Sequence, residues 1–347
     1  MELHGVKIAV TGGAGFIGSH VVDALLARGS EVVAIDDFST GTRENLAHHD
    51  GNARLHVEEA SVLDEPAMHR LLRGAACVLH LATRSVRVSL KRPTAVHEVN
   101  TTGTLNVLKA AAAARAKRFL YCSSSEVIGT AGVVPITEDY VFRPETIYGA
   151  SKLAGEYYAQ VFNRSGWLPT VIARPFNTYG PREYFEGSKG EVIPRFIMQA
   201  LSGRALTVYG DGLQTRDFIY VSETADYLVR LAGHAGAVGA TFNVCRGEEI
   251  TIRDVAARIA ELVGVDVSIR HLPARPSDVL RLYGSNDRLS RLLGDAPSVS
   301  MRAGLARTID WFRSRAPVAM QGLGFLDADN WSAQEGEAWM ERAAAPD

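Results

Sequence analysis

A glycine-rich turn near the start of the chain sets the strongest limit on its fold. Lys7–Thr11 reads as an apolar strand that runs into Gly12-Gly13-Ala14-Gly15-Phe16-Ile17-Gly18, after which a helical pattern continues to Arg28. The first glycine permits a tight turn, Gly15 lets a pyrophosphate approach the backbone, and Gly18 lets the helix pack close to the strand. The free N–H groups at the helix start would then bind phosphate oxygens. The pattern predicts a dinucleotide-binding strand–turn–helix unit.

An acidic residue follows at the spacing that such a unit requires. A second apolar strand, at 31–35, ends in Asp36, which lies 24 residues after Gly12. An acid at about this distance binds the ribose hydroxyls of a dinucleotide. It would repel a 2′-phosphate, and the next basic residue is Arg43, so the pattern favours NAD over NADP. A loop acid or a helix cap is the alternative interpretation of Asp36.

Short apolar runs alternate with helical patterns through the first half of the chain. We expect further strands at 54–57, 77–81, 118–122 and 169–173, and helices at 66–72, 99–114 and 148–162. Strands that alternate with helices of this length form parallel sheets through right-handed crossovers. The sequence therefore predicts an α/β fold with a Rossmann-type, doubly wound parallel sheet.

The texture of the sequence changes after Pro181. We expect a loop at 187–190, helices at 191–201 and 252–262, and a strand at 206–209, which together indicate a smaller α/β substrate-binding lobe. A chain of 347 residues suits about two cooperating lobes. We assign 1–180 to the NAD-binding domain, with later segments returning to it, and 181–313 mainly to the second lobe. The remaining 314–347 read as an acidic appendage.

Composition excludes several classes of protein. Hydrophobic residues make up 46% of the chain and charged residues 22%, which is ordinary for a globular protein and rules out disorder over its whole length. The net charge of −2 gives no sign of nucleic-acid binding. Since no apolar run reaches the ~18 residues of a membrane span, we expect a cytoplasmic protein. Its 3 scattered cysteines form neither a disulfide framework nor a metal site.

Taken with Tyr148-Gly-Ala-Ser-Lys152, the glycine-rich turn resembles the extended short-chain dehydrogenase/reductase family. The closer resemblance is to its NAD-dependent nucleotide-sugar epimerases and dehydratases, the group that includes the UDP-glucose/UDP-galactose 4-epimerases. It extends over about 6–313. The further motifs are His80-Leu-Ala82, Asn100, Ser123-Ser124-Ser125-Glu126-Val-Ile-Gly129, Arg174-Pro-Phe-Asn177-Thr-Tyr-Gly-Pro181-Arg182, Gly210-Asp-Gly212 with Gln214-Thr-Arg216-Asp217, and Arg275-Pro-Ser-Asp278.

Tyr148 and Lys152 are four residues apart on an expected helix, so both project from one face. Such a pair alone is usually surface decoration, but here it follows a dinucleotide loop and a Ser-Ser strand end. A nearby ammonium and a positive nicotinamide would favour the tyrosine phenolate, which could act as a base. The resemblance implies that Lys152 also holds the nicotinamide ribose and that Ser124 shares the substrate hydroxyl with Tyr148.

The resemblance also implies contacts to both ligands. Cofactor contacts are expected from Gly12, Gly15, Phe16, Ile17, Gly18, Asp36, Leu81, Ala82, Asn100, Tyr148 and Lys152. Substrate contacts are expected from Arg84, Ser124, Asn177, Arg216, Arg275 and Asp278. In these assignments Arg216 and Arg275 hold the two phosphates of a nucleotide-diphosphate sugar, and Asp278 holds the nucleotide ribose. Arg84 belongs to a loop at 83–89 that we expect either to face the sugar or, more simply, to be solvated.

Three functions remain open. The first is a 4-epimerase that oxidises the C4 hydroxyl of a nucleotide-activated hexose to a ketone and returns hydride to the other face. The second is a 4,6-dehydratase or a UDP-glucuronate decarboxylase that uses Glu126 near C5; Ser125, where some dehydratases carry aspartate, favours epimerisation narrowly. The third is a non-catalytic NAD-binding regulator. In this family, the helices expected at 99–114 and 148–162 form the interface of a homodimer.

Overall fold

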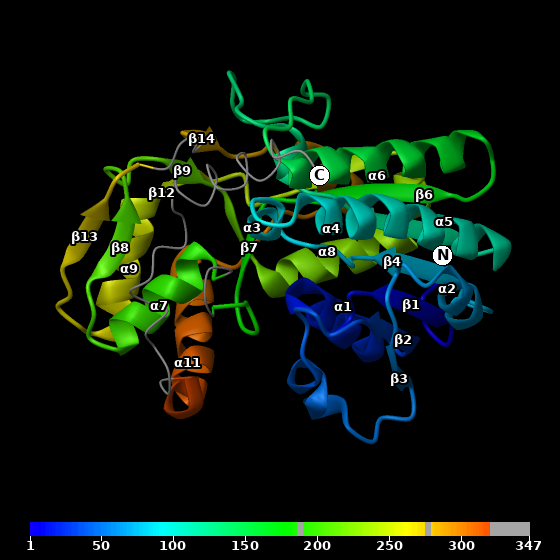
Figure 1. Cartoon of the computed structure of the whole chain (residues 1–347), viewed down its shortest axis with the longest axis horizontal. Helices are drawn as coiled ribbons and strands as arrows, with labels where there is room; N and C mark the ends of the chain where they lie inside the picture. Colours follow the sequence, from blue (N-terminus) through cyan, green and yellow to red (C-terminus); the bar gives the residue numbers. More distant parts are fainter. Residues whose placement is uncertain (186–189, 275–278, 320–347) are drawn as a thin grey trace, which may run out of the picture.

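The computed structural model of the chain describes residues 1–185, 190–274 and 279–319 (Figure 1). Its central sheet has seven parallel strands in the order β11-β6-β5-β4-β1-β2-β3. The strands are β1 (Lys7–Thr11), β2 (Glu31–Asp36), β3 (Leu55–Glu59), β4 (Cys77–His80), β5 (Arg118–Cys122), β6 (Thr170–Pro175) and β11 (Thr241–Val244). This order runs outward from β1 in both directions, so the predicted Rossmann-type, doubly wound fold is confirmed.

Helices cover both faces of this sheet. On one face lie α1 (Phe16–Ala27) and α8 (Val221–Gly233), and on the other α2 (Glu65–Leu71), α5 (Thr104–Ala113) and α6 (Ile147–Arg164). Because side chains alternate along a strand, Ile8 and Val10 pack into the first core and Ala9 into the second. The buried strands are therefore apolar on both sides, as parallel sheets require.

The helix expected at 99–114 is interrupted, which corrects the sequence-based boundary. A short helix α4 (Pro93–His97) leads into a π-helical segment at Glu98–Gly103, and α5 begins only at Thr104. The Thr104 hydroxyl donates to the Asn100 carbonyl oxygen at 2.6 Å inside this wider turn. Turns of this kind are frequent at functional sites because they redirect a side chain. Here the turn carries Asn100.

A smaller lobe follows along the chain. Its helices are α7 (Val192–Leu201), α9 (Ile252–Val263) and α11 (Met301–Ala319), and they pack with the parallel pair β8 (Leu206–Tyr209) and β13 (Ile269–Leu272) around a separate apolar core. Short strands lie between the lobes: β7 (Asn177–Tyr179) with β10 (Phe218–Tyr220), and β9 (Thr215–Arg216) with β12 (Ile250–Thr251) and β14 (Arg281–Leu282).

Part of the sequence-based organisation lies outside the described residues. This applies to most of the loop expected at 187–190 and to the appendage from residue 320 onward. Within the described ranges, no helix has both the length and the apolar character that a bilayer crossing demands.

Candidate active site

A cavity of about 430 Å³ lies at the carboxyl ends of the central strands. The predicted site residues on its wall are Gly12, Gly15, Phe16, Ile17, Gly18, Asp36, Leu81, Ala82, Arg84, Ser124, Glu126, Tyr148, Lys152 and Asn177. Asn100 and Arg216 do not line it, and Arg275 and Asp278 lie outside the described residues. Segments far apart in the sequence thus meet in one place.

The glycine-rich turn has the shape that close approach of a phosphate requires. Gly12 has a φ of +71°, and a Cβ there would lie 2.8 Å from the backbone nitrogen of Ala82. A Cβ on Gly18 would lie 1.9 Å from the Gly12 carbonyl oxygen, so helix α1 can start against the turn only with glycine at this position. The turn and the start of α1 therefore fit a bound pyrophosphate.

Asp36 fixes the end of β2 to this turn. One carboxylate oxygen accepts a hydrogen bond from the Ala14 N–H at 3.0 Å, and the other accepts one from the Phe38 N–H at 2.9 Å. The side chain is buried, and burial raises its pKa above the ordinary value. Each carboxylate oxygen keeps a further lone pair, so the residue can still accept hydrogen bonds from a ribose.

Arg84 lies at the Asp36 end of the cavity, and its loop is not solvated. Its guanidinium donates to the Asp37 carboxylate at 2.8 Å, and the two side chains are only 21% and 27% exposed. This placement corrects the solvated loop that the sequence suggested, whereas the contact of Arg84 with the sugar stays a prediction. Since β1 lies between β2 and β4, the ion pair spans the end of β1. Sequence reasoning missed the role of Asp37.

Asn100 supports this loop from behind the cavity wall. Its carboxamide oxygen accepts a hydrogen bond from the Arg84 N–H at 2.7 Å, and its amide donates to the Arg84 carbonyl at 3.1 Å and to the Ser151 hydroxyl at 3.0 Å. These partners occupy the side chain, which is 1% exposed. Asn100 therefore holds the loop that makes the wall, and its contact with the cofactor stays a prediction.

Ser124 and Tyr148 form a hydroxyl pair at the other end of the cavity. Ser124 follows β5, and its side chain accepts a hydrogen bond from the Glu126 N–H at 3.2 Å. Tyr148 stands in the first turn of α6, whose Thr146 side chain caps the Gly149 N–H at 2.9 Å. Burial and the carboxylate of Glu126 raise the pKa of Tyr148, whereas its hydrogen bond with Ser124 lowers it.

Lys152 lies one helical turn beyond Tyr148 and is 3% exposed. Its ammonium donates to the Cys122 carbonyl oxygen at 2.5 Å and lies 4.7 Å from the centre of the Tyr121 ring. Burial lowers the pKa of Lys152 to about 8. Among the described residues no hydrogen bond joins it to Tyr148, so the expected pairing of the two side chains stays a prediction.

A buried ion pair lies next to the segments that carry Ser124 and Lys152, and sequence reasoning missed it. Glu156, one turn after Lys152, accepts hydrogen bonds from Arg174 at 2.8 and 2.7 Å and from the Ser123 hydroxyl at 2.5 Å. Glu156 and Arg174 are 0% and 1% exposed. The four-residue spacing from Lys152 is the only sequence signal for this role. Removing one partner of such a pair leaves an uncompensated charge in the core.

The substrate side is described in part. Asn177 lines the cavity, and its buried carboxamide oxygen has no hydrogen-bond partner among the described residues, so it is available to a ligand. Arg216 donates to the Val279 carbonyl at 2.7 Å. Neighbouring Asp217 is fully buried and accepts hydrogen bonds from the backbone of three distant residues, Arg246, Gly247 and Gly284.

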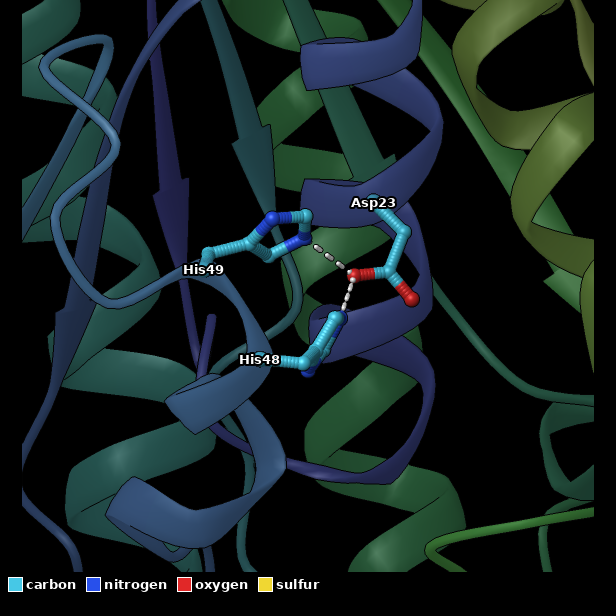
Figure 2. A group of neighbouring side chains, drawn as sticks. All are labelled: Asp23, His48 and His49. Carbon is cyan, nitrogen blue, oxygen red and sulfur yellow. Dashed lines mark hydrogen bonds and ion pairs between the residues drawn. The ribbon is translucent and has the colours of Figure 1, made fainter.

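A cluster of metal-ligating residue types lies outside the cavity. One oxygen of Asp23 accepts hydrogen bonds from Nε2 of His48 and of His49, each at 2.8 Å (Figure 2). The other oxygen accepts one from Arg182 at 2.8 Å. Two ligand atoms of a tetrahedral zinc ion would stand about 3.3 Å apart, which is farther than the atoms joined by these hydrogen bonds. The guanidinium of Arg182 would also repel a cation. We therefore interpret the cluster as a hydrogen-bond network that joins α1 to two loops.

A family model described as "NAD dependent epimerase/dehydratase family" matches residues 8–245. The chain is 35% identical over 314 residues to UDP-glucose 4-epimerase of Mycolicibacterium smegmatis, covering 90% of this chain and all of that protein. It is 36% identical to UDP-glucuronic acid decarboxylase 2 of Arabidopsis thaliana, covering 91% of this chain and 70% of that protein.

The chain is also similar to a solved structure of a third kind of nucleotide-sugar enzyme. The dTDP-glucose 4,6-dehydratase DesIV of Streptomyces venezuelae, with NAD bound, has a TM-score of 0.84 and 32% identity, covering 90% of this chain and 98% of its own. The chain is thus comparably similar to enzymes that catalyse three different reactions.

Replacement of Lys152 by methionine tests the cost of its buried charge. Below about pH 8 the folded chain carries a buried ammonium, whereas between pH 8 and the ordinary lysine pKa the unfolded chain binds more protons, so wild-type stability rises with pH there. Lys152→Met should therefore raise the free energy of unfolding at pH 7 by about 1–3 kcal/mol and show a smaller gain at pH 9.5, while activity is lost. Urea denaturation of cofactor-free protein measures this.

The matched control is Lys109→Met, which removes an exposed lysine paired with Glu65. It should change stability by less than about 1 kcal/mol. A Lys152→Met protein less stable than wild type at pH 7 would contradict the expected cost.

Proposed function

The chain belongs to the NAD-dependent epimerase/dehydratase family, and we propose that it is a 4-epimerase of a nucleotide-activated hexose. The family comprises NAD-dependent nucleotide-sugar epimerases, dehydratases and decarboxylases. The observation that carries the proposal is the Ser124–Tyr148 hydroxyl pair, with Lys152 one turn away, in the cavity that contains the glycine-rich turn. A non-catalytic regulator would not need this pair or a buried lysine.

The cofactor would occupy the half of the cavity whose shape fits a dinucleotide. The N–H groups at the start of α1 would hold the pyrophosphate, Asp36 the adenosine ribose, and Lys152 the nicotinamide ribose. When bound, NAD supplies reversible acceptance of a hydride from the sugar.

Ser124 and Tyr148 would handle the proton of the C4 hydroxyl. Ser124 holds the hydroxyl through a hydrogen bond, and Tyr148 accepts its proton as the ketone forms, then returns it when the alcohol is restored. Since burial raises the pKa of Tyr148, the phenol is protonated in the cofactor-free chain at neutral pH. Positive charge brought to the site by Lys152 and the oxidised cofactor would lower that pKa.

Epimerisation is favoured over dehydration by the residue at position 125. Ser125 contributes no carboxylate where some dehydratases carry an aspartate, although other dehydratases carry serine there, so the preference is narrow. A keto sugar that turns in the cavity can then accept hydride on its other face.

Glu126 supports a second candidate function. Its carboxyl group lines the cavity and is close enough to Tyr148 to raise the pKa of that phenol. A carboxylate so placed could remove a C5 proton, as a dehydratase requires, or act near C5 in a decarboxylase.

We also propose that the enzyme is a homodimer that pairs through α6. Ile147, Tyr157 and Val161 are 47%, 48% and 40% exposed and lie on this helix. Exposed apolar groups that share one helix face are typical of a self-complementary interface.

Replacement of Tyr148 by phenylalanine removes the proton acceptor and little else. We expect the rate of 4-epimerisation to fall by about 100-fold or more, with the fold and NAD binding retained. The measurements are product formation by NMR and the NAD content of the purified protein. Activity within a few-fold of wild type would exclude Tyr148 from the mechanism.

Replacement of Glu126 by glutamine separates the two candidate reactions. A 4-epimerase should keep its activity within about 10-fold and leave C5 unlabelled in deuterium oxide, because no C5 proton is lost. A dehydratase should lose about 100-fold or more, and the wild type should place deuterium at C5 and accumulate a 4-keto-6-deoxy sugar. NMR of the sugar product distinguishes these results, and the second would replace the 4-epimerase proposal.

The Val161→Arg variant tests the dimer. A charge at the centre of an apolar interface has no partner, so wild-type protein should be a dimer and the variant a monomer by light scattering at micromolar concentration. Val238→Arg changes a similarly exposed valine away from α6, and it should remain dimeric. A monomeric wild type would refute the proposal.

A further inference from the structure

Acidic side chains gather at the Tyr148 end of the cavity. Besides Glu126, the wall contains Glu183, from the loop after β7, and Glu191, from the residue before α7. The two segments run side by side, since the Glu191 N–H donates to the Tyr184 carbonyl at 3.4 Å. Glu183 is 5% exposed, and its carboxylate accepts the Gly180 N–H at 3.3 Å.

The nearby cation Arg87 already forms an ion pair with one of these acids. Arg87, on the short helix α3 (Val86–Ser89), binds Glu191 through two hydrogen bonds, from Nε at 3.3 Å and from its terminal nitrogen at 2.9 Å. Burial lowers the pKa of this arginine, but the carboxylates of Glu191 and Glu183 raise it above the ordinary value, so all three side chains interact. Arg87 itself does not line the cavity, and Lys152, which does, donates to the Cys122 carbonyl.

Among the described residues, carboxyl groups thus outnumber the cations near them. Burial and the nearby charge of Glu191 hold the pKa of Glu183 well above its ordinary value, against the opposing effect of Arg87. The carboxylates of Glu183 and Glu191 thus already oppose each other's charge in this part of the cavity. Another anion placed beside them would meet like charge in a poorly solvated site.

We infer that Glu183 and Glu191 make the sugar subsite selective for nucleotide hexoses without a carboxylate, and that they exclude hexuronates. A neutral hexose offers hydroxyl groups, which can donate hydrogen bonds to both acids. A hexuronate offers a carboxylate, which can donate none and adds a repulsive charge, so the subsite discriminates by what it rejects. This inference rests on the proposed function for the location of the sugar, but it concerns which sugar enters.

Glu191 has a second effect through Arg87. Its carboxylate occupies the guanidinium fork, which would otherwise match the carboxylate of a uronate in the same two-point manner. Loss of the negative charge at position 191 should therefore do more than reduce repulsion, because it releases a cation that can bind a uronate. The Glu191→Gln variant should consequently gain affinity for the excluded sugar.

The test compares the binding of UDP-glucose, UDP-glucuronate and UDP alone, by calorimetry, in the NAD-bound enzyme. A Tyr148→Phe background prevents turnover during the titration. We expect UDP-glucuronate to bind on the order of 100-fold more weakly than UDP-glucose. In Glu191→Gln and in the double variant Glu183→Gln/Glu191→Gln, that ratio should fall by about 10-fold or more. Glu59→Gln is the matched control, since it removes an exposed carboxylate paired with Arg43 and should leave the ratio unchanged.

Two results would overturn the inference. Equal binding of the two sugar nucleotides by the otherwise unmodified site would show that the acids do not select. A large ratio that persists in the double variant, with its fold verified by circular dichroism, would show that other residues do. Failure of the proposed function looks different: the Glu191-dependent ratio would be present, supporting the inference, while wild-type enzyme formed no 4-epimer from UDP-glucose.

Discussion

Parallel strands deliver their carboxyl ends to one edge of a sheet, and the whole candidate site depends on that constraint. The glycine-rich turn follows β1, Asp36 ends β2, the Arg84 loop follows β4, and Ser124 follows β5. In an antiparallel sheet neighbouring strands would end at opposite edges, and these groups could not line one cavity. The buried, apolar strands supply rigidity, while the chemistry is carried by the loops between strand and helix.

The cost of this arrangement is buried charge, and the chain handles it in two ways. Glu156 and Arg174 neutralise each other and share further hydrogen bonds with Ser123 and a backbone carbonyl, so the strand end next to Ser124 is held by a fully satisfied network. Lys152 has no carboxylate bonded to it among the described residues, and its charge is poorly solvated until ligands arrive. A structural network and a reactive group therefore occupy adjacent turns of α6. The charge of Glu156 is neutralised by a bonded partner, whereas among the described residues no carboxylate is bonded to Lys152.

The sequence was most informative where structure is locally determined. The strand–turn–helix unit and the Tyr148–Lys152 pair follow from spacing over a few residues, and both were predicted. Helix α8 was not predicted from the sequence, because strand β10 continues directly into this helix without a glycine, a proline or another turn signal between them. The position of Asn100 behind the wall depends on a wider turn within an expected regular helix. The Arg84–Asp37 pair and the hydrogen bonds of Asp217 join residues tens of positions apart, and no local pattern specifies them.

Two ligands would share this cavity, but they need very different residence times. A cofactor restored to its starting state in every cycle gains nothing by leaving, whereas the sugar nucleotide must exchange at each turnover. The Arg84–Asp37 bridge lies at the Asp36 end of the cavity, across the end of β1, so a dinucleotide bound there would lie beside this ion pair. Exchange of substrate at the Tyr148 end of the cavity would leave this ion pair in place. The same fold can thus retain the cofactor while the substrate binds and dissociates.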